Sequence, residues 1–287
     1  MKKSYAMREL APQTSWSDTP AQAPAEEGKL DVGGARIWYW DTGGAGEAVV
    51  LVHPHSGSAL NWGYQQPALA AAGYRAVAYS RRGHHGSDAG SPENPGTGAG
   101  DLHKLAEHLG IGRMHLVGLA AGADILPDFA ISWPKRLLSL AIGCTIGKPG
   151  DPAWSACQSE LLPPEVRNLP RWISELGPSY RAACPEGVKR WRELEARSRT
   201  RQERVPVPAE NEVTPELIGQ IEAPTLLFTG DADLYMPPSR LRAYAAYWTD
   251  PEVVLFTEAG HSVYWEQYEA FNAILLDFFR RHPGGDS

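Results

Sequence analysis

The stretch from Met114 to Ile125, reading MHLVGLAAGADI, constrains the fold of this chain more than any other segment. A short apolar run leads into Gly118-Leu119-Ala120-Ala121-Gly122, and a segment with helical composition follows. Small residues at both ends of that pentapeptide allow the backbone to turn sharply from a strand into a helix. We therefore expect Ala120, between the two glycines, to stand above the edge of a sheet.

Apolar runs alternate with helical patterns over most of the remaining chain. Such alternation favours right-handed crossovers and an α/β fold, a mostly parallel sheet of eight strands with helices on both faces. The predicted strands lie at residues 29–32, 35–41, 48–53, 74–80, 114–117, 137–144, 225–229 and 252–256.

Composition divides the 287 residues into three parts. Residues 1–27 are rich in Ala, Pro, Ser and Thr, which predicts a flexible N-terminal tail or an arm lying on the surface. Residues 28–146 and 223–287 carry the strand–helix rhythm and form the predicted core. Residues 147–222 are rich in proline and charge, and their helical patterns predict an inserted helical cap.

Two later loops extend the pattern of the 118–122 turn. Gly230-Asp231-Ala232-Asp233 follows one predicted strand, and Ala259-Gly260-His261-Ser262 follows the next. In this order the three segments resemble the nucleophile elbow, acid loop and histidine loop of the α/β-hydrolase superfamily. The resemblance extends from about Lys29 to the end of the chain. It implies a capped α/β-hydrolase fold with Asp233 and His261 as catalytic residues, and Asp231 as the competing acid.

The nucleophile position of that pattern is Ala120, which carries no hydroxyl. Either a serine was replaced to give an inactive variant, or the alanine is native. Pro54 and Ser80 also depart from the family pattern, and both are expected near the same site. Clustered departures favour native divergence.

A His–Asp dyad keeps its chemistry without a serine, because an oriented imidazole can take a proton from water or from an acidic substrate. Three functions follow. The first is hydrolysis of a small, largely apolar ester, lactone or activated C–C bond. The second is cofactor-free dioxygenase or lyase chemistry by substrate deprotonation. The third is ligand binding without turnover, which retention of the dyad disfavours.

The resemblance also implies an oxyanion hole. Its backbone donors would be Ala121, after the elbow position, and a residue of the loop His53-Pro54-His55, for which His55 is the candidate. The His55 side chain either enters the pocket or faces solvent.

Large aromatic side chains in the predicted cap, Trp154, Trp172 and Trp191, either line an apolar substrate pocket or form core. Ser80 is a candidate substrate contact or a core hydroxyl bonded to backbone. Cys144 lies in an apolar run and is interpreted as an inert buried thiol.

Composition narrows the function classes. The net charge is −7 with no basic stripe, which disfavours nucleic-acid binding, and no apolar run is long enough to span a bilayer. Three cysteines without C-x-x-C spacing indicate reduced thiols in a cytoplasmic protein. His53, His55, His84 and His85 lack a nearby acidic cluster, so we expect no metal and no cofactor. The expected partner is a small-molecule substrate. Whether the chain forms a homodimer is left open by the sequence.

Overall fold

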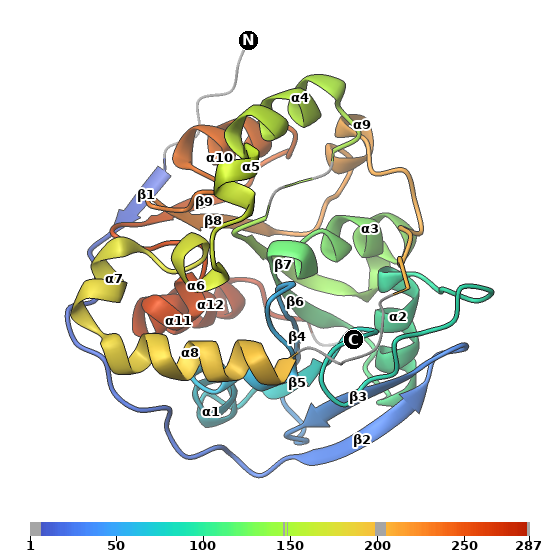
Figure 1. Cartoon of the computed structure of the whole chain (residues 1–287). Coiled ribbons are helices and arrows are strands. Elements are labelled where there is room, and N and C mark those ends of the chain that lie inside the picture. Colours follow the sequence, from blue (N-terminus) through green and yellow to red (C-terminus); the bar gives the residue numbers. More distant parts are fainter. Residues whose placement is uncertain (1–6, 146, 148, 199–204, 286–287) are drawn as a thin grey trace.

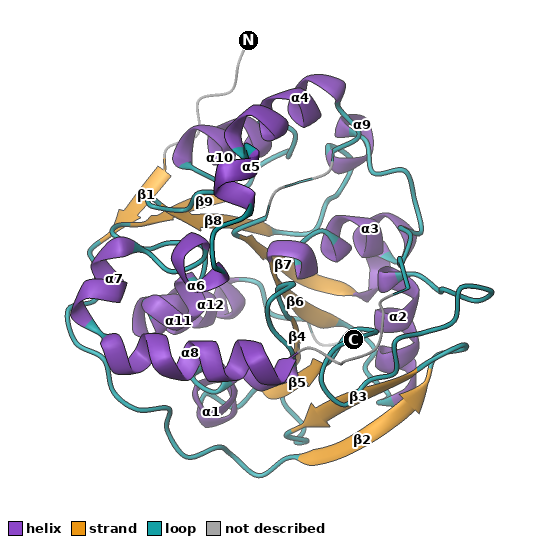
Figure 2. Ribbon diagram, viewed as in Figure 1, coloured by secondary structure: helices purple, strands orange, loops and turns teal. Residues whose placement is uncertain are grey.

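The structure is a computed structural model, and it describes residues 7–145, 147, 149–198 and 205–285. Nine strands of the described residues form one sheet in the order β1-β9-β8-β7-β6-β4-β5-β3-β2, with helices on both sides (Figure 2). The strands are β1 (Met7–Leu10), β2 (Glu26–Asp31), β3 (Arg36–Asp41), β4 (Ala48–Val52), β5 (Arg75–Tyr79), β6 (Met114–Leu119), β7 (Leu137–Gly143), β8 (Thr225–Gly230) and β9 (Glu252–Phe256).

The predicted fold class, an α/β-hydrolase fold with a mostly parallel sheet, is confirmed. The pairs β2–β3 and β3–β5 are antiparallel, and the other neighbouring pairs are parallel. The predicted count of eight strands is one short, because Met7–Leu10 pairs in parallel with β9. That strand has polar residues at two of four positions, so its sequence carries no apolar run.

Helices cover the sheet in two layers, each with its own apolar core. Phe129 and Leu102 belong to the core between the sheet and α2 (Gly98–His108), α3 (Ile125–Ser132) and α10 (Pro238–Ala245). Leu69 and Phe278 belong to the core under α1 (Gln65–Ala71), α11 (Val263–Glu266) and α12 (Tyr268–Arg281). Within the described ranges, no helix is long and apolar enough to cross a membrane.

The segment predicted as a cap consists of short helices. Five of its six helices begin at a proline, a place where the missing N–H costs nothing. A further proline follows within three residues of the ends of α4, α5 and α7. Figure 1 shows this run from α4 at the top to α8 in the lower part of the view. Residues 148 and 199–204 of the predicted cap lie outside the described residues. The helices are α4 (Pro152–Leu161), α5 (Pro164–Arg167), α6 (Arg171–Ser174), α7 (Pro178–Ala183), α8 (Pro185–Ser198) and α9 (Pro215–Ile218).

The N-terminal segment, predicted as a flexible tail or a surface arm, lies against the helices as an arm from Met7 onward. After β1, the Trp16 indole donates to the Glu266 carbonyl at 2.6 Å, and Ser17 bonds the Tyr268 hydroxyl. Further along, the Gln66 side chain bonds the backbone of Ala23. These contacts hold the arm on the layer of α1, α11 and α12, and it ends in β2. Residues 1–6 lie outside the described part.

The turn after β6 is as tight as the sequence predicts. Ala120 has a positive φ of 50°, a left-handed conformation that residues other than glycine rarely adopt. A Cβ at Gly122 would lie 2.3 Å from the Val52 carbonyl oxygen, and one at Gly118 would lie 2.8 Å from the Cα of Ala123. Both glycines are therefore needed, because only backbone fits between β4 and α3. The turn places Ala120 above the carboxyl edge of the sheet.

We predict that Gly122→Ala destabilises the fold by about 1–3 kcal/mol, the usual cost of forcing an extra carbon into a packed region. Gly112→Ala is the matched control, because a Cβ there meets nothing within 4 Å. It should change the free energy of unfolding by less than about 0.5 kcal/mol. Urea unfolding followed by circular dichroism measures both. Equal midpoints for the two variants would contradict the tight-turn interpretation.

Candidate active site

The structure brings His261 and Asp233 together at the carboxyl edge of the sheet. The Nδ1 atom of His261 lies 2.8 Å from Oδ2 and 2.9 Å from Oδ1 of Asp233. A carboxylate only accepts hydrogen bonds, so Nδ1 carries the proton in the neutral imidazole and Nε2 has the lone pair. Asp233 also accepts the N–H groups of Tyr235 and Met236, at 2.7 and 3.1 Å. Its orientation is thus fixed independently of the histidine.

Burial and charge act in opposite directions on this pair. Burial by itself would lower the pKa of His261, but the carboxylates of Asp233, Glu175 and Glu266 together outweigh it, and the pKa is raised above the ordinary 6.5. Burial would raise the pKa of Asp233, yet His261 and the two N–H donors hold that pKa below its ordinary value. Each shift favours an ionised Asp233 beside a basic imidazole.

The other candidate acid does not face the histidine. Asp231 is exposed and accepts the N–H of Glu258 at 2.7 Å. Cys144 is fully buried, and burial raises the pKa of its thiol well above the ordinary value. A thiol that stays protonated is a poor nucleophile, as expected from its apolar run.

Two polar side chains, His53 and Ser80, lie in or near the oxyanion loop, which is residues 53–56. Both form hydrogen bonds with the backbone. The backbone N–H of Arg81 donates to Nε2 of His53 at 2.9 Å, so the proton of this ring is on Nδ1, which bonds the Pro54 carbonyl. Ser80, a candidate substrate contact, is fully buried. Its hydroxyl accepts the N–H of Ala59 at 3.3 Å, which makes it a core hydroxyl rather than a pocket residue.

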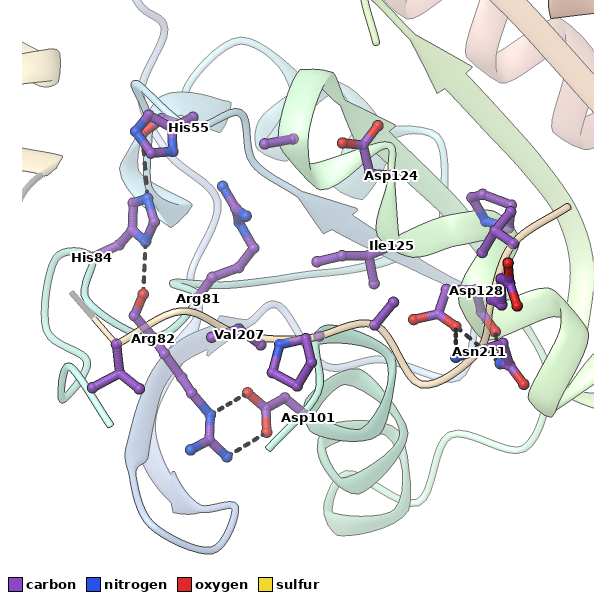
Figure 3. A pocket seen from close by; sticks show the side chains of 18 of the residues that line it. His55, Arg81, Arg82, His84, Asp101, Asp124, Ile125, Asp128, Val207 and Asn211 are labelled. Atoms are coloured by element: carbon purple, nitrogen blue, oxygen red, sulfur yellow. Dashed lines mark hydrogen bonds and ion pairs between the residues drawn. The ribbon is translucent and has the colours of Figure 1, made fainter. Parts of the chain in front are cut away.

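A pocket of about 470 Å³ opens beside the turn and is lined by both expected oxyanion residues, His55 and Ala121. Figure 3 shows His55, Arg81 and His84 at one end of this pocket and Asp124 across from them. Its lining is rich in charge, because Arg82, Asp101 and Asp128 also face it. Ala120 and His261 are not among its lining residues, which differs from the cavity the sequence predicts. They are 8% and 6% exposed.

The pocket wall opposite the oxyanion loop is held by one carboxylate. Asp128 of α3 accepts the backbone N–H groups of Glu210 and Asn211 and the Asn211 side-chain amide, at 2.8 to 2.9 Å (Figure 3). These bonds attach the cap segment between α8 and α9 to the core. The Arg82–Asp101 ion pair, at 2.7 Å, closes the pocket floor.

The cap tryptophans do not line this pocket, which corrects the expectation of an apolar wall. Trp191 is 1% exposed inside the core. Trp154 packs under the Arg240 guanidinium at 3.4 Å, and its indole donates to the Gly147 carbonyl. Trp172 is half-buried on the core, near the guanidinium of Arg192. Their size made them candidates, but they fill the interfaces between the cap, the core and α10.

Two buried glutamates near His261, Glu266 and Glu175, are not predicted from the sequence. Glu266 accepts the N–H groups of Gly260 and Ser262, the two neighbours of His261, at 3.0 and 3.2 Å. Burial raises the pKa of Glu266 to about 7. Glu175 of the cap is 4% exposed and accepts the Ser56 hydroxyl at 2.5 Å. Glu266 has a weak signal in its closeness to the histidine loop, whereas Glu175 has none.

Metal binding has no cluster to support it in the described part of the chain. No group of three or more His, Cys, Asp or Glu side chains there is arranged to hold an ion. His53 and His84 are ring neighbours, with centroids 4.5 Å apart, and His84 Nε2 faces the His55 carbonyl at 3.3 Å. These nitrogens are engaged with backbone.

The fold and the loop order define an α/β hydrolase, and the comparison with known proteins agrees. The sequence profile of the alpha/beta hydrolase family matches residues 49–274, and the chain belongs to this family.

Among its relatives, the chain is 28% identical over 267 residues to a 2-hydroxy-6-oxononadienedioate/2-hydroxy-6-oxononatrienedioate hydrolase of Burkholderia vietnamiensis, covering 86% of this chain and 91% of that protein. It is 27% identical to the dihydrolipoyllysine-residue acetyltransferase component of an acetoin cleaving system of Pseudomonas putida, over 91% of this chain and 71% of that protein. Its fold is similar to that of a thermophilic esterase from Thermogutta terrifontis, with a TM-score of 0.71, 24% identity, and coverage of 90% of this chain and 100% of that one.

We predict that Asp233→Asn lowers the pKa of His261, because it removes the largest of the negative charges that oppose burial. Asp231→Asn should leave that pKa unchanged. Histidine labelled with ¹⁵N and titrated by NMR measures both, with the His261 signal assigned by its loss in His261→Gln. A His261 pKa that responds equally to both variants would contradict the pairing with Asp233.

Proposed function

We propose that this chain is a hydrolase of a small ester, lactone or activated C–C bond, with the His261–Asp233 dyad activating water or substrate in place of a serine nucleophile. The observation that carries the proposal is the hydrogen bond from His261 Nδ1 to Asp233 at 2.8 Å, at the same edge of the sheet as the turn that carries Ala120. Family membership supports the reaction class.

The first step is proton transfer to His261. Its Nε2 lone pair accepts a proton from water as the oxygen attacks the substrate carbonyl carbon, and Asp233 stabilises the imidazolium that forms. The proton then passes to the leaving oxygen or carbon, which restores the neutral imidazole. No acyl-enzyme forms at position 120, because a methyl group has no lone pair.

The second requirement is a site for the developing oxyanion. The backbone N–H groups of Ala121 and His55 are the proposed donors, and both residues line the pocket beside the turn. Ala121 follows the nucleophile position in the chain, as the donor does in the family pattern.

The pocket lining suggests a substrate with polar groups. Arg81, Arg82 and His84 lie in the lining together with Asp124 and Asp128, whereas the cap tryptophans do not. Apolar side chains such as Ile125 and Val207 share the lining, so it suits a substrate that has both apolar and polar parts. The Burkholderia relative is named as a hydrolase of oxo-dioates, and the enol-lactonase of Burkholderia xenovorans has a similar fold with a TM-score of 0.68 and 21% identity. These names support a carbonyl substrate of this kind.

A second candidate has one observation in its favour. Because Ala120 supplies no hydroxyl, the dyad is equally suited to remove an acidic C–H or O–H proton of the substrate itself. Lyase or cofactor-free dioxygenase chemistry would begin this way. Turnover that requires dissolved oxygen, or that yields no hydrolysis product, would select this candidate over the first.

We predict that His261→Ala lowers kcat about 10²–10⁴-fold, the usual contribution of a positioned acid–base group. The native rate should rise with pH through a titration above 6.5, since the base acts only when neutral and its pKa is raised. Turnover of p-nitrophenyl acetate, an enol lactone and a 2-hydroxy-6-oxo-dienoate tests this. Asp231→Asn is the charge control and should stay near native. Native turnover by His261→Ala would remove the base assignment.

Restoring a hydroxyl tests the role of position 120. Native protein should not react with a fluorophosphonate probe at the turn, and Ala120→Ser should react if the turn presents that side chain to the dyad. A large gain of esterase activity in Ala120→Ser would indicate a serine site that has lost its nucleophile. Unchanged activity would favour a native serine-free mechanism. Intact-mass spectrometry of probe-treated protein measures the labelling.

A further inference from the structure

Four consecutive residues of the cap, Ser174 to Gly177, contact all three loops of the candidate site. The Tyr235 hydroxyl, on the acid loop, donates to the Ser174 hydroxyl at 3.0 Å. Glu175 accepts from Ser56 of the oxyanion loop at 2.5 Å. The Gly177 N–H donates to Glu266 at 2.8 Å, and the same carboxylate oxygen accepts the N–H beside His261.

The fit of this segment on the histidine loop is close. A Cβ on Gly260 would lie 2.4 Å from the Gly177 nitrogen and 3.0 Å from the Glu175 carbonyl oxygen. The ring of Tyr235, which bonds the neighbouring Ser174, packs on the His261 ring with centroids 4.5 Å apart. The position of Glu175 at the histidine loop is therefore fixed in two ways: its own carbonyl packs against Gly260, and its neighbour Ser174 bonds Tyr235.

The Glu175 carboxylate is built into this place. Ser56 donates to Oε2, and the Arg171 guanidinium lies 3.2 Å from Oε1 in an ion pair where the arginine is 34% and the glutamate 5% exposed. The carboxylate is thus engaged at both oxygens, by a hydroxyl donor and by a partly exposed cation. Because it is buried, its electric field on neighbouring groups is only weakly screened.

We propose that Glu175 is a positioning residue of the site: from the cap, it fixes the oxyanion loop through Ser56 and directs a second negative charge at His261. This inference rests on the proposed function only in assigning His261 as the base. It means that the site is complete only when the cap is folded, because Glu175 lies at the end of the cap helix α6 and not in the core.

The groups around His261 come from three elements. Asp233 and Tyr235 lie on the loop after β8, Glu266 lies on α11, and Glu175 lies at the end of α6. Burial lowers the pKa of His261, and the three carboxylates oppose it in the order Asp233, Glu175, Glu266. Burial raises the pKa of the Tyr235 phenol, which stays neutral. Glu175 is thus the largest contributor after the dyad partner.

The test replaces Glu175 by glutamine, which keeps an oxygen acceptor for Ser56 and removes the charge. The matched control is Glu195→Gln, because Glu195 pairs with the same Arg171, at 3.7 Å, and is 24% exposed. The full chain, with ¹⁵N-labelled histidine, is titrated by NMR, and circular dichroism verifies that each variant is folded. We expect a lower His261 midpoint in Glu175→Gln and a native midpoint in Glu195→Gln.

Glu175→Asp retains the charge, and it should give a midpoint between native and glutamine variants; it also serves if glutamine prevents folding. With an ester substrate, the acid limb of the kcat profile should move to lower pH in Glu175→Gln while KM stays near native. A native midpoint in Glu175→Gln, or an equal shift in Glu195→Gln, overturns the inference. If the native chain turns over no substrate, the proposed function fails, and the NMR midpoints still decide the role of Glu175.

Discussion

The close contact between the turn after β6 and the end of β4 sets the geometry of the whole carboxyl edge. Because Gly122 has no side chain, the turn before α3 packs directly against the Val52 and His53 carbonyls at the end of β4. The strands β4 and β6 pair in parallel, so their carboxyl ends lie side by side at this point. The acid loop after β8 and the histidine loop after β9 then open at the same edge. Gly230 repeats the principle, since a Cβ there would lie 2.1 Å from the Ala259 carbonyl oxygen. Close backbone packing, rather than any one side chain, brings the chemical groups together.

Much of this edge could be predicted from the sequence, because each of its loops follows a strand buried on both faces. The strands β4 and β6 read as continuous apolar runs, and the glycines around Ala120 marked the turn between them. Local signals of this kind identify which residues lie at strand ends. Parallel pairing then brings those ends to one edge.

The remaining features depend on contacts between distant segments, which no local pattern encodes. Glu175 lies at the end of a short helix that begins after a proline, and its partner Ser56 is 119 residues away in the chain. The tryptophans of the cap have the size of pocket residues, but burial against Arg240 and the core decides their role. Strand β1 exists because β9 offers it an open edge, and its own residues do not favour a strand.

The arm that joins β1 to β2 connects the two edges of the sheet. The two strands are consecutive in the chain, yet they form the opposite edges of the sheet, with the arm running along one helical layer between them (Figure 1). In β1, Met7 pairs with Val253 of β9. A strand that is synthesised early therefore pairs with one that is synthesised late. During translation, therefore, this edge stays unpaired until β9 has left the ribosome. The pairing of β1 with β9 therefore forms late, and contacts between residues so far apart in the sequence form slowly in folding. Until that moment the nascent chain exposes β1 as an unpaired strand, the kind of edge that chaperones shield.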